Sequence, residues 1–182
     1  MVDWASKYVP PTSHPHVLEV GSGNGTLLLA LVDAGFDASK LAGVDYSPDA
    51  VKLAQMIAST RNGELVSFSV CDFLTEVPPP PSKTTDAWDL ILDKGTYDAI
   101  ALGEKDADGR SPASGYPVRV SNLLKENGFF LITSCNFTEE ELKKNFITLE
   151  TGLKYHSRIN HPTISFGGKS GSVYATVAFQ KI

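Results

Sequence analysis

Acidic side chains accompany three apolar stretches in the first half of the chain, in positions suited to bind a polar ligand. Glu19 lies within HVLEV, Asp45 ends LAGVD, and Asp72 follows VSFSVC. Each of these stretches has the composition of a buried strand. Open parallel sheets bind their ligands at the carboxyl ends of the strands, so we expect the three carboxylates at one edge of a sheet.

A glycine-rich turn separates the first predicted strand from a helix. HVLEVGSGNG at 16–25 has a glycine at every second position from 21 onward, and the apolar LLLALV follows. Glycine permits a tight turn and a close ligand approach, and a helix N-terminus offers free N–H groups to an anion. A dinucleotide fingerprint would place its third glycine at 26, where the chain has Thr26, so the pattern is E-x-G-x-G-x-G instead. A turn without a ligand is the alternative to a binding loop formed by Glu19, Gly21, Ser22, Gly23, Asn24 and Gly25.

The acids of the second and third predicted strands are expected to meet a nucleoside. Asp45 stands about twenty residues after the glycines, where a carboxylate lies beside a ribose and accepts hydrogen bonds from its hydroxyls. Tyr46 is placed to lie against either an adenine or the next helix. Asp72 and the backbone of Phe73 are placed to meet the amino edge of an adenine. The alternatives are a capping or loop role for Asp45 and a solvated turn for Asp72.

The stretch AWDLILDKGTYDAI at 87–100 supplies the predicted reaction centre. Its apolar core forms a buried strand, and Asp93 stands at the carboxyl end, with Tyr97 one helical turn later. We expect both side chains to line the centre, because open sheets place their sites at this end. The alternative is a solvated ion pair between Asp93 and Lys94, which would contribute little to stability.

The composition indicates one globular domain without a membrane-spanning stretch or a signal peptide. The chain has 182 residues, of which 42% are apolar and 20% charged, with a net charge of −5. The acidic charge disfavours a general nucleic-acid binder. Cys71 and Cys135 form no redox or metal motif, which favours reduced thiols in a cytoplasmic protein. The four histidines have no ligand-like spacing, and we expect no metal site.

The rest of the chain continues an alternation of strands and helices. Ser47 and Pro48 begin a helix, for which an apolar stripe of Ala50, Leu53, Ala54 and Ile57 is predicted. Residues 75–86 and 103–115 are expected to be surface segments, followed by a helix at 116–125 and a strand at 128–136. Thr138 and Glu141 form a capping box for the next helix, and 152–159 and 172–181 are predicted strands.

Five stretches in this order resemble the elongation factor 1-alpha lysine methyltransferases, a type-2 branch of the seven-β-strand methyltransferases. They are LEVGSGNG, GVDYSP, DKGTYDAI, GFFLITSCNFTEEEL and FGGKSG…VAFQK. The resemblance implies an α/β fold, Rossmann-like and doubly wound, with a mostly parallel sheet in the order 3-2-1-4-5-7-6 and strand 7 antiparallel. It also implies S-adenosylmethionine as cofactor, S-adenosylhomocysteine as product, and elongation factor 1-alpha as protein substrate of a monomeric cytoplasmic enzyme that contacts no nucleic acid or membrane.

The resemblance also assigns roles to residues. Glu19, Gly21, Gly23 and Gly25 would surround the methionyl part of the cofactor, Asp45 would hold the ribose, and Asp72 and Phe73 would border the adenine. Asp93 would begin the motif where cofactor and target lysine meet. Independently of the resemblance, an aromatic ring such as that of Tyr97 or Phe137 is suited to flank a methylammonium by cation–π contact. An alternative substrate is a small molecule or a nucleic acid, although nucleic-acid amine methyltransferases carry N-P-P-Y where this chain has DKGT.

The front of the chain departs from the family pattern. Members carry a longer segment before the first strand, whereas here residues 1–15 are expected to be the remnant of such a segment and 16–182 the methyltransferase domain. A second alternative is therefore a cofactor-binding module with little turnover.

Overall fold

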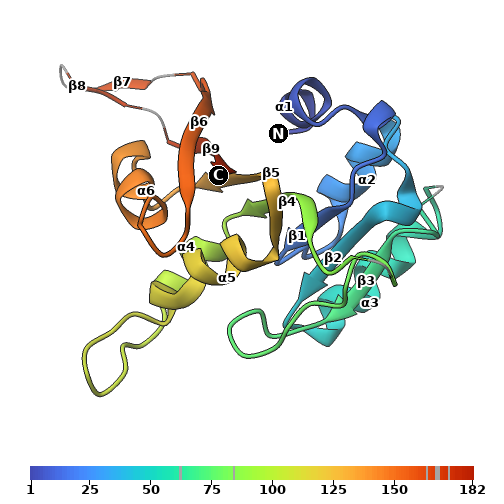
Figure 1. Ribbon diagram of the computed structural model, residues 1–182, viewed down its shortest axis with the longest axis horizontal. Coiled ribbons are helices and arrows are strands. Elements are labelled where there is room, and N and C mark those ends of the chain that lie inside the picture. Colours follow the sequence, from blue (N-terminus) through green and yellow to red (C-terminus); the bar gives the residue numbers. More distant parts are fainter. Residues whose placement is uncertain (62, 84, 163, 167–168, 172) are drawn as a thin grey trace.

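A single mixed sheet forms the centre of the computed structural model, which describes residues 1–61, 63–83, 85–162, 164–166, 169–171 and 173–182 (Figure 1). Within these residues, seven strands hydrogen-bond in the order β3-β2-β1-β4-β5-β9-β6. Only β9 runs antiparallel to its neighbours, so the expected order and the antiparallel seventh strand are confirmed. The strands are β1 (Val17–Val20), β2 (Leu41–Asp45), β3 (Ser67–Val70), β4 (Trp88–Lys94), β5 (Leu124–Ser134), β6 (Leu153–Ile159) and β9 (Ala175–Lys181).

Helices cover both faces of the sheet (Figure 1). One apolar core lies beneath α1 (Val2–Tyr8), α2 (Thr26–Asp33) and α3 (Pro48–Ala58). The other lies beneath α4 (Thr96–Ala101), α5 (Tyr116–Leu123) and α6 (Glu139–Phe146). Because successive strand residues alternate in direction, Leu90 and Leu92 of β4 enter the first core, whereas Ile91 enters the second. Burying each of these side chains contributes about 1.5–3 kcal/mol to stability.

The predicted helix caps are present. The Ser47 hydroxyl accepts a hydrogen bond from the Ala50 amide, and Pro48 occupies the first helical position of α3. Thr138 and Glu141 exchange both bonds of a capping box at the start of α6. The buried face of α3 is offset by about one residue from the predicted apolar stripe. Val51, Ala54 and Ala58 face the core, whereas Leu53, which was predicted to do so, is 48% exposed.

The first helix is attached to the far edge of the sheet. Trp4 is buried, and its indole N–H donates a 2.9 Å hydrogen bond to the hydroxyl of Ser157 on β6. Its ring also meets Phe129 of β5 edge-on at 5.5 Å between centroids. Trp4 is therefore a packing residue that joins α1 to strands more than a hundred residues later.

Strand β5 differs from its predicted bounds, and the chain adds a short hairpin. β5 begins at Leu124, where the helix was expected to continue, and α5 ends at Leu123. The pair Asn127 and Gly128 is typical of a helix end, and Asn127 does have a left-handed φ of +63°. It lies inside β5, however, as part of a bulge opposite β4. The segment between the last two sheet strands adds a hairpin of β7 (Ile164–Phe166) and β8 (Lys169–Gly171). Positions 167, 168 and 172, which fall within the FGGKSG stretch and the last predicted strand, lie outside the described residues.

The two edges of the sheet are short or irregular. β3 has four residues, and the pairing of β6 with β9 shifts register between Tyr155 and Ser157. Over the described residues, no helix combines the length and apolarity needed to cross a bilayer.

Candidate active site

A cavity of about 460 Å³ opens at the carboxyl ends of the first strands. This volume lies within the range of about 300–1,000 Å³ typical of small-molecule sites. Five of the predicted binding residues line it, namely Gly21, Asp45, Tyr46, Asp72 and Phe73. The turn after β4 and helix α4 contribute the opposite wall through Thr96, Ala99 and Ile100. The structure thus brings three strand ends and one helix around a single space, as the sequence predicted for the first three.

The glycine turn needs glycine for two different reasons. Gly21 has φ +67°, and a Cβ built there would lie 1.9 Å from Oγ1 of Thr96, so no other residue fits. Gly23 has φ +52°, but its Cβ would meet nothing within 4 Å, so it faces open space. Gly25 is the N-cap of α2 in the left-handed conformation. Open space above a left-handed glycine is what a ligand approaching the backbone requires.

Asp45 holds the glycine turn and also lines the cavity. Its Oδ2 accepts a 2.9 Å hydrogen bond from the Gly23 amide, and its Oδ1 accepts one of 2.9 Å from the Ser47 amide. The side chain is 8% exposed. Since an ionised carboxylate has about four acceptor positions, two remain for a ligand. The loop role and the ligand role, which the sequence left as alternatives, are therefore compatible.

Tyr46 and Asp72 stand at the mouth of the cavity. Tyr46 is 80% exposed, which excludes the alternative that its ring packs against the next helix. The exposed Asp72 organises its own turn, because its carboxylate accepts bonds from the Leu74 amide at 3.0 Å and the Thr75 hydroxyl at 2.8 Å. Phe73 is buried beside it. Asp72 and Phe73, which follow β3, thus both line the cavity, and hydrogen bonds hold the turn that carries them.

Two buried polar atoms beside the turn lack partners within the described part of the chain. They are Oε2 of Glu19 and Oγ of Ser22, although neither residue lines the 460 Å³ cavity itself. Burial raises the pKa of Glu19 to about 8, although the nearby Lys94 ammonium opposes this rise. An unpartnered buried carboxylate is costly unless a cation or donor reaches it. The site therefore fits a ligand that presents an ammonium group next to the glycine turn.

Asn24 and Gly25 serve the start of α2. Asn24 is exposed, and its Oδ1 accepts hydrogen bonds from the hydroxyl and amide of Thr26 at 3.0 and 3.3 Å. The structure places both residues outside the lining of the 460 Å³ cavity, and their contact with a ligand stays a prediction.

Asp93 lies behind the cavity wall and not on it. It is fully buried, which rules out the alternative of a solvated ion pair with Lys94. Its carboxylate accepts hydrogen bonds from the amides of Thr96 at 2.9 Å and Tyr97 at 3.0 Å, and from the Tyr116 hydroxyl at 2.5 Å. Burial raises the pKa of Asp93 to about 7, although these three donors oppose the rise.

Tyr97 is also buried. Its hydroxyl accepts a 3.1 Å hydrogen bond from Asn145, and its ring meets Phe137 at 5.1 Å between centroids. The expectation that Asp93 and Tyr97 line the reaction centre is not matched by these positions, since neither lines the cavity. Asp93 instead caps the first turn of α4, and a part for either residue in catalysis stays a prediction.

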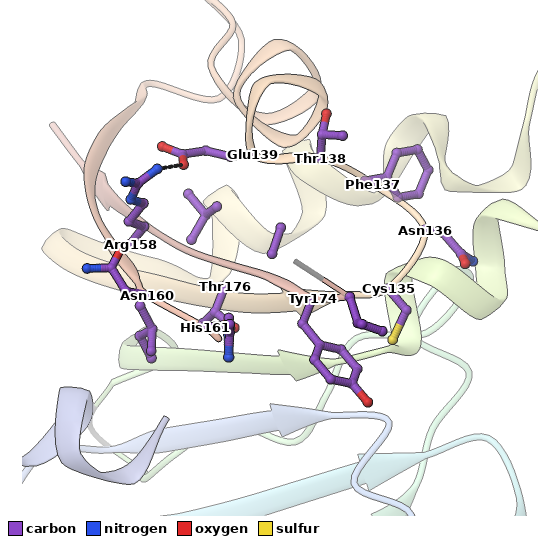
Figure 2. Close-up of a pocket in the computed structure, with 14 residues that line it drawn as sticks. Cys135, Asn136, Phe137, Thr138, Glu139, Arg158, Asn160, His161, Tyr174 and Thr176 are labelled. Atoms are coloured by element: carbon purple, nitrogen blue, oxygen red, sulfur yellow. Dashed lines mark hydrogen bonds and ion pairs between the residues drawn. The ribbon is translucent and has the colours of Figure 1, made fainter. Parts of the chain in front are cut away.

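A second cavity of about 370 Å³ lies beyond the end of β5 (Figure 2). Its labelled side chains come from two sides, which are the segment leading into α6 and the end of β6 with the chain that runs from there into β9. An ion pair between Arg158 and Glu139 joins the two sides. His161 shares a 2.7 Å hydrogen bond with Thr176 in its lining. Asn136 and Phe137 were recognisable as the end of a strand, but the opposite wall comes from residues more than twenty positions later and gave no sequence signal.

Helix α4 connects the two cavities. Ala99 and Ile100 line the first. Asp98 fixes the rim of the second, because its carboxylate accepts bonds from the Cys135 amide at 2.7 Å and the Ser134 hydroxyl at 2.5 Å. The two cavities are thus positioned by opposite faces of one short helix.

The sheet order, the glycine turn and the acidic strand ends define a Rossmann-like methyltransferase. A family model described as a methyltransferase domain matches residues 11–174. The crystal structure of an S-adenosylmethionine-dependent methyltransferase from Clostridium acetobutylicum has the same fold, with a TM-score of 0.70 at 13% identity over 99% of this chain and 90% of that one.

Curated relatives define the family more narrowly. The mouse EEF1A lysine methyltransferase 2 is 38% identical over 181 residues, which cover 100% of this chain and 69% of that protein. The protein-lysine N-methyltransferase efm4 of Schizosaccharomyces pombe is 42% identical over 90% of this chain and 68% of its own length. The chain belongs to this family of protein-lysine methyltransferases.

Proposed function

We propose that this protein transfers a methyl group from S-adenosylmethionine to a lysine side chain of elongation factor 1-alpha. The observation that carries the proposal is the identity of 38–42% with relatives named as lysine methyltransferases, over at least 90% of the chain. The −5 net charge and the absence of the N-P-P-Y pattern also favour a protein substrate over a nucleic acid.

The cofactor is assigned to the 460 Å³ cavity. Asp45 would accept hydrogen bonds from ribose hydroxyls, while Asp72, Phe73 and the exposed ring of Tyr46 would border the adenine. The unpartnered oxygen of Glu19 would accept a hydrogen bond from the amino group of the methionyl part.

Bound S-adenosylmethionine supplies a methyl group on a positively charged sulfur. The chain itself has to hold the nucleophile in line with that methyl group, and such positioning is worth about 7–11 kcal/mol. A free lysine has a pKa of about 10.4, so the ammonium must lose a proton before it reacts, and desolvation favours the neutral amine. Asp93 makes no direct contact with solvent, and we assign it to holding the turn Lys94–Thr96 and not to accepting the proton.

The second cavity is our candidate for the segment that carries the target lysine. It lies beyond the ends of β5 and β6 and shares helix α4 with the cofactor cavity. Its lining is mixed, with Asn136, Asn160 and His161 for polar contacts and Phe137 for an apolar one. We further propose that the enzyme acts as a monomer in the cytoplasm, where the free thiols of Cys71 and Cys135 are expected to remain reduced.

A radiolabel-transfer assay tests the function directly. Purified elongation factor 1-alpha is incubated with the protein and methyl-labelled S-adenosylmethionine, and the modified residue is located by mass spectrometry. Label on a lysine of the factor is the expected result. Asp45→Ala should abolish transfer, whereas Asp33→Ala, which removes an exposed carboxylate far from the cavity, should not.

The alternatives give different results in the same assay. Label in added RNA or in a small molecule, with none in the factor, would replace the proposed substrate. Tight binding of S-adenosylhomocysteine without transfer to any acceptor would identify a cofactor-binding module.

A further inference from the structure

Helix α5 touches both walls of the cofactor cavity without lining it. Tyr116 and Arg119 lie three residues apart, so they share one face of the helix. Tyr116 is fully buried, and neither residue appears in the lining of the 460 Å³ cavity. Their contacts nevertheless lead to the turn after β4 and to the turn after β3.

Tyr116 supports the wall that follows β4. Its hydroxyl donates to Oδ2 of Asp93, whose carboxylate also holds the amide of Thr96. The hydroxyl of Thr96 in turn donates a 2.8 Å hydrogen bond to the carbonyl of Val20, directly before the glycine turn. Since a Cβ on Gly21 would overlap Thr96, any displacement of Thr96 changes the space at the glycine turn.

Arg119 supports the wall that follows β3. Its guanidinium donates to the carbonyl of Glu76 and lies 5.6 Å from the centre of the Phe73 ring. The carboxylate of Glu76 accepts a 2.9 Å hydrogen bond from the amide of Asp72. Arg119 therefore fixes both ends of the segment 72–76, which carries the proposed adenine contacts.

The ring of Tyr116 joins the two supports. It meets the Phe73 ring at 5.0 Å between centroids, while its hydroxyl reaches Asp93. Aromatic contacts and hydrogen bonds to a buried carboxylate both stabilise the geometry in which they form. The two walls are thus braced from one helix behind them.

We infer that Tyr116 and Arg119 are positioning residues that fix the two walls of the cofactor cavity, Tyr116 at the methionyl end and Arg119 at the adenine end. This inference rests on the proposed function, because it uses the proposed orientation of the cofactor. Neither side chain touches the ligand, so each acts through the turn that it holds.

Binding of two ligands to single variants tests the inference. The probes are S-adenosylhomocysteine, which has both ends, and 5′-methylthioadenosine, which lacks the amino-acid end. Tyr116→Phe removes one hydroxyl and keeps the ring. It should lower the affinity for S-adenosylhomocysteine by about tenfold and change the affinity for 5′-methylthioadenosine by less than about twofold. Arg119→Met should lower the affinity for both ligands by about tenfold, because both contain the adenine.

Conservative and control variants separate positioning from general stability. Arg119→Lys keeps a cation for Phe73 and a donor for Glu76, and should restore most of the affinity. Asn122 lies on the same helix but is exposed, and Arg61 is an exposed arginine in the turn after α3. The variants Asn122→Ala and Arg61→Met should both bind the two ligands like the wild type. Melting temperatures measured without ligand show whether a variant is folded.

The outcomes distinguish this inference from the proposed function. If the wild type binds neither ligand, the proposed cofactor is wrong. If the wild type binds both ligands, and Tyr116→Phe and Arg119→Met bind them as tightly as the wild type, only the inference is overturned. An equal loss of affinity for both ligands in Tyr116→Phe would also overturn the inference, since the two walls would then not be held separately.

Discussion

The amide of Gly23 donates a 2.9 Å hydrogen bond to Oδ2 of Asp45. The residue proposed to bind the ribose is therefore also the residue that shapes the glycine turn. Loss of its carboxylate would act on the ligand directly and on the backbone around it.

Asp45→Asn should bind S-adenosylhomocysteine at least tenfold more weakly than the wild type. The amide keeps the size of the side chain but loses the charge, and a hydrogen bond to a charged group is worth about 1.5–3 kcal/mol. Calorimetric titration measures the affinity, with Asp33→Asn as an exposed control. Equal affinity of Asp45→Asn and wild type would contradict the ribose assignment.

Gly21→Ala and Gly23→Ala should fail in different ways. Both positions have positive φ, which costs about 1–3 kcal/mol for a residue with a Cβ. At Gly21 the Cβ also overlaps Thr96, so the melting temperature should fall far more than at Gly23. Gly23→Ala should stay folded and lose affinity for S-adenosylhomocysteine, because its Cβ points into open space. The idea of a binding loop would not survive if Gly23→Ala bound normally.

Cofactor binding near pH 7 should release a proton from Glu19. Burial raises its pKa to about 8, so the free protein carries a protonated Glu19 at this pH. An ammonium placed beside the carboxylate favours its ionised form and lowers that pKa. Binding enthalpies measured in buffers of different ionisation enthalpy give the number of protons released. Release should disappear near pH 9, where Glu19 is already ionised, and in Glu19→Gln at all pH values.

The free protein should lose stability as the pH rises from about 4.5 to 8. The pKa values of Glu19 and Asp93 are about 8 and about 7 when folded, against 4.5 and 3.8 for the ordinary groups. Between these limits the folded state binds more protons than the unfolded state, so the free energy of unfolding decreases with pH. For Glu19 alone the loss is on the order of 5 kcal/mol, and it is nearly complete by about pH 9.

Urea unfolding at several pH values measures this dependence. His16 and His156, whose pKa values are lowered by burial, act in the opposite direction below about pH 6.5. The difference between wild type and Glu19→Gln cancels these contributions and isolates Glu19. A difference that does not vary with pH would show that Glu19 ionises normally in the folded protein.

The sequence predicted where residues lie in the fold when local pattern and strand position were sufficient. Asp45 and Asp72 stand at strand ends, and a doubly wound sheet brings such ends to one edge whatever the details of packing. The capping box of α6 is a local motif, so it could be recognised from Thr138 and Glu141 alone.

The sequence could not predict contacts that depend on side chains meeting across elements. Nothing in the pattern around Tyr116 indicates that its hydroxyl reaches Asp93, and so the burial of Asp93 was missed. The same reason applies to the second cavity, whose walls are separate in sequence. The bulge at Asn127 was misjudged because a left-handed residue is as typical of the end of a helix as of an irregularity within a strand.

The irregular pairing of β6 has a consequence for the behaviour of the chain at high concentration. An exposed strand edge can pair with the edge of another molecule and start aggregation. The register shift between Tyr155 and Ser157 interrupts the straight row of backbone donors and acceptors, and the exposed Lys154 and Arg158 flank it with positive charge. At the opposite edge, β3 offers only four residues to a partner strand. Both open ends of the sheet are therefore poor templates for intermolecular β-pairing.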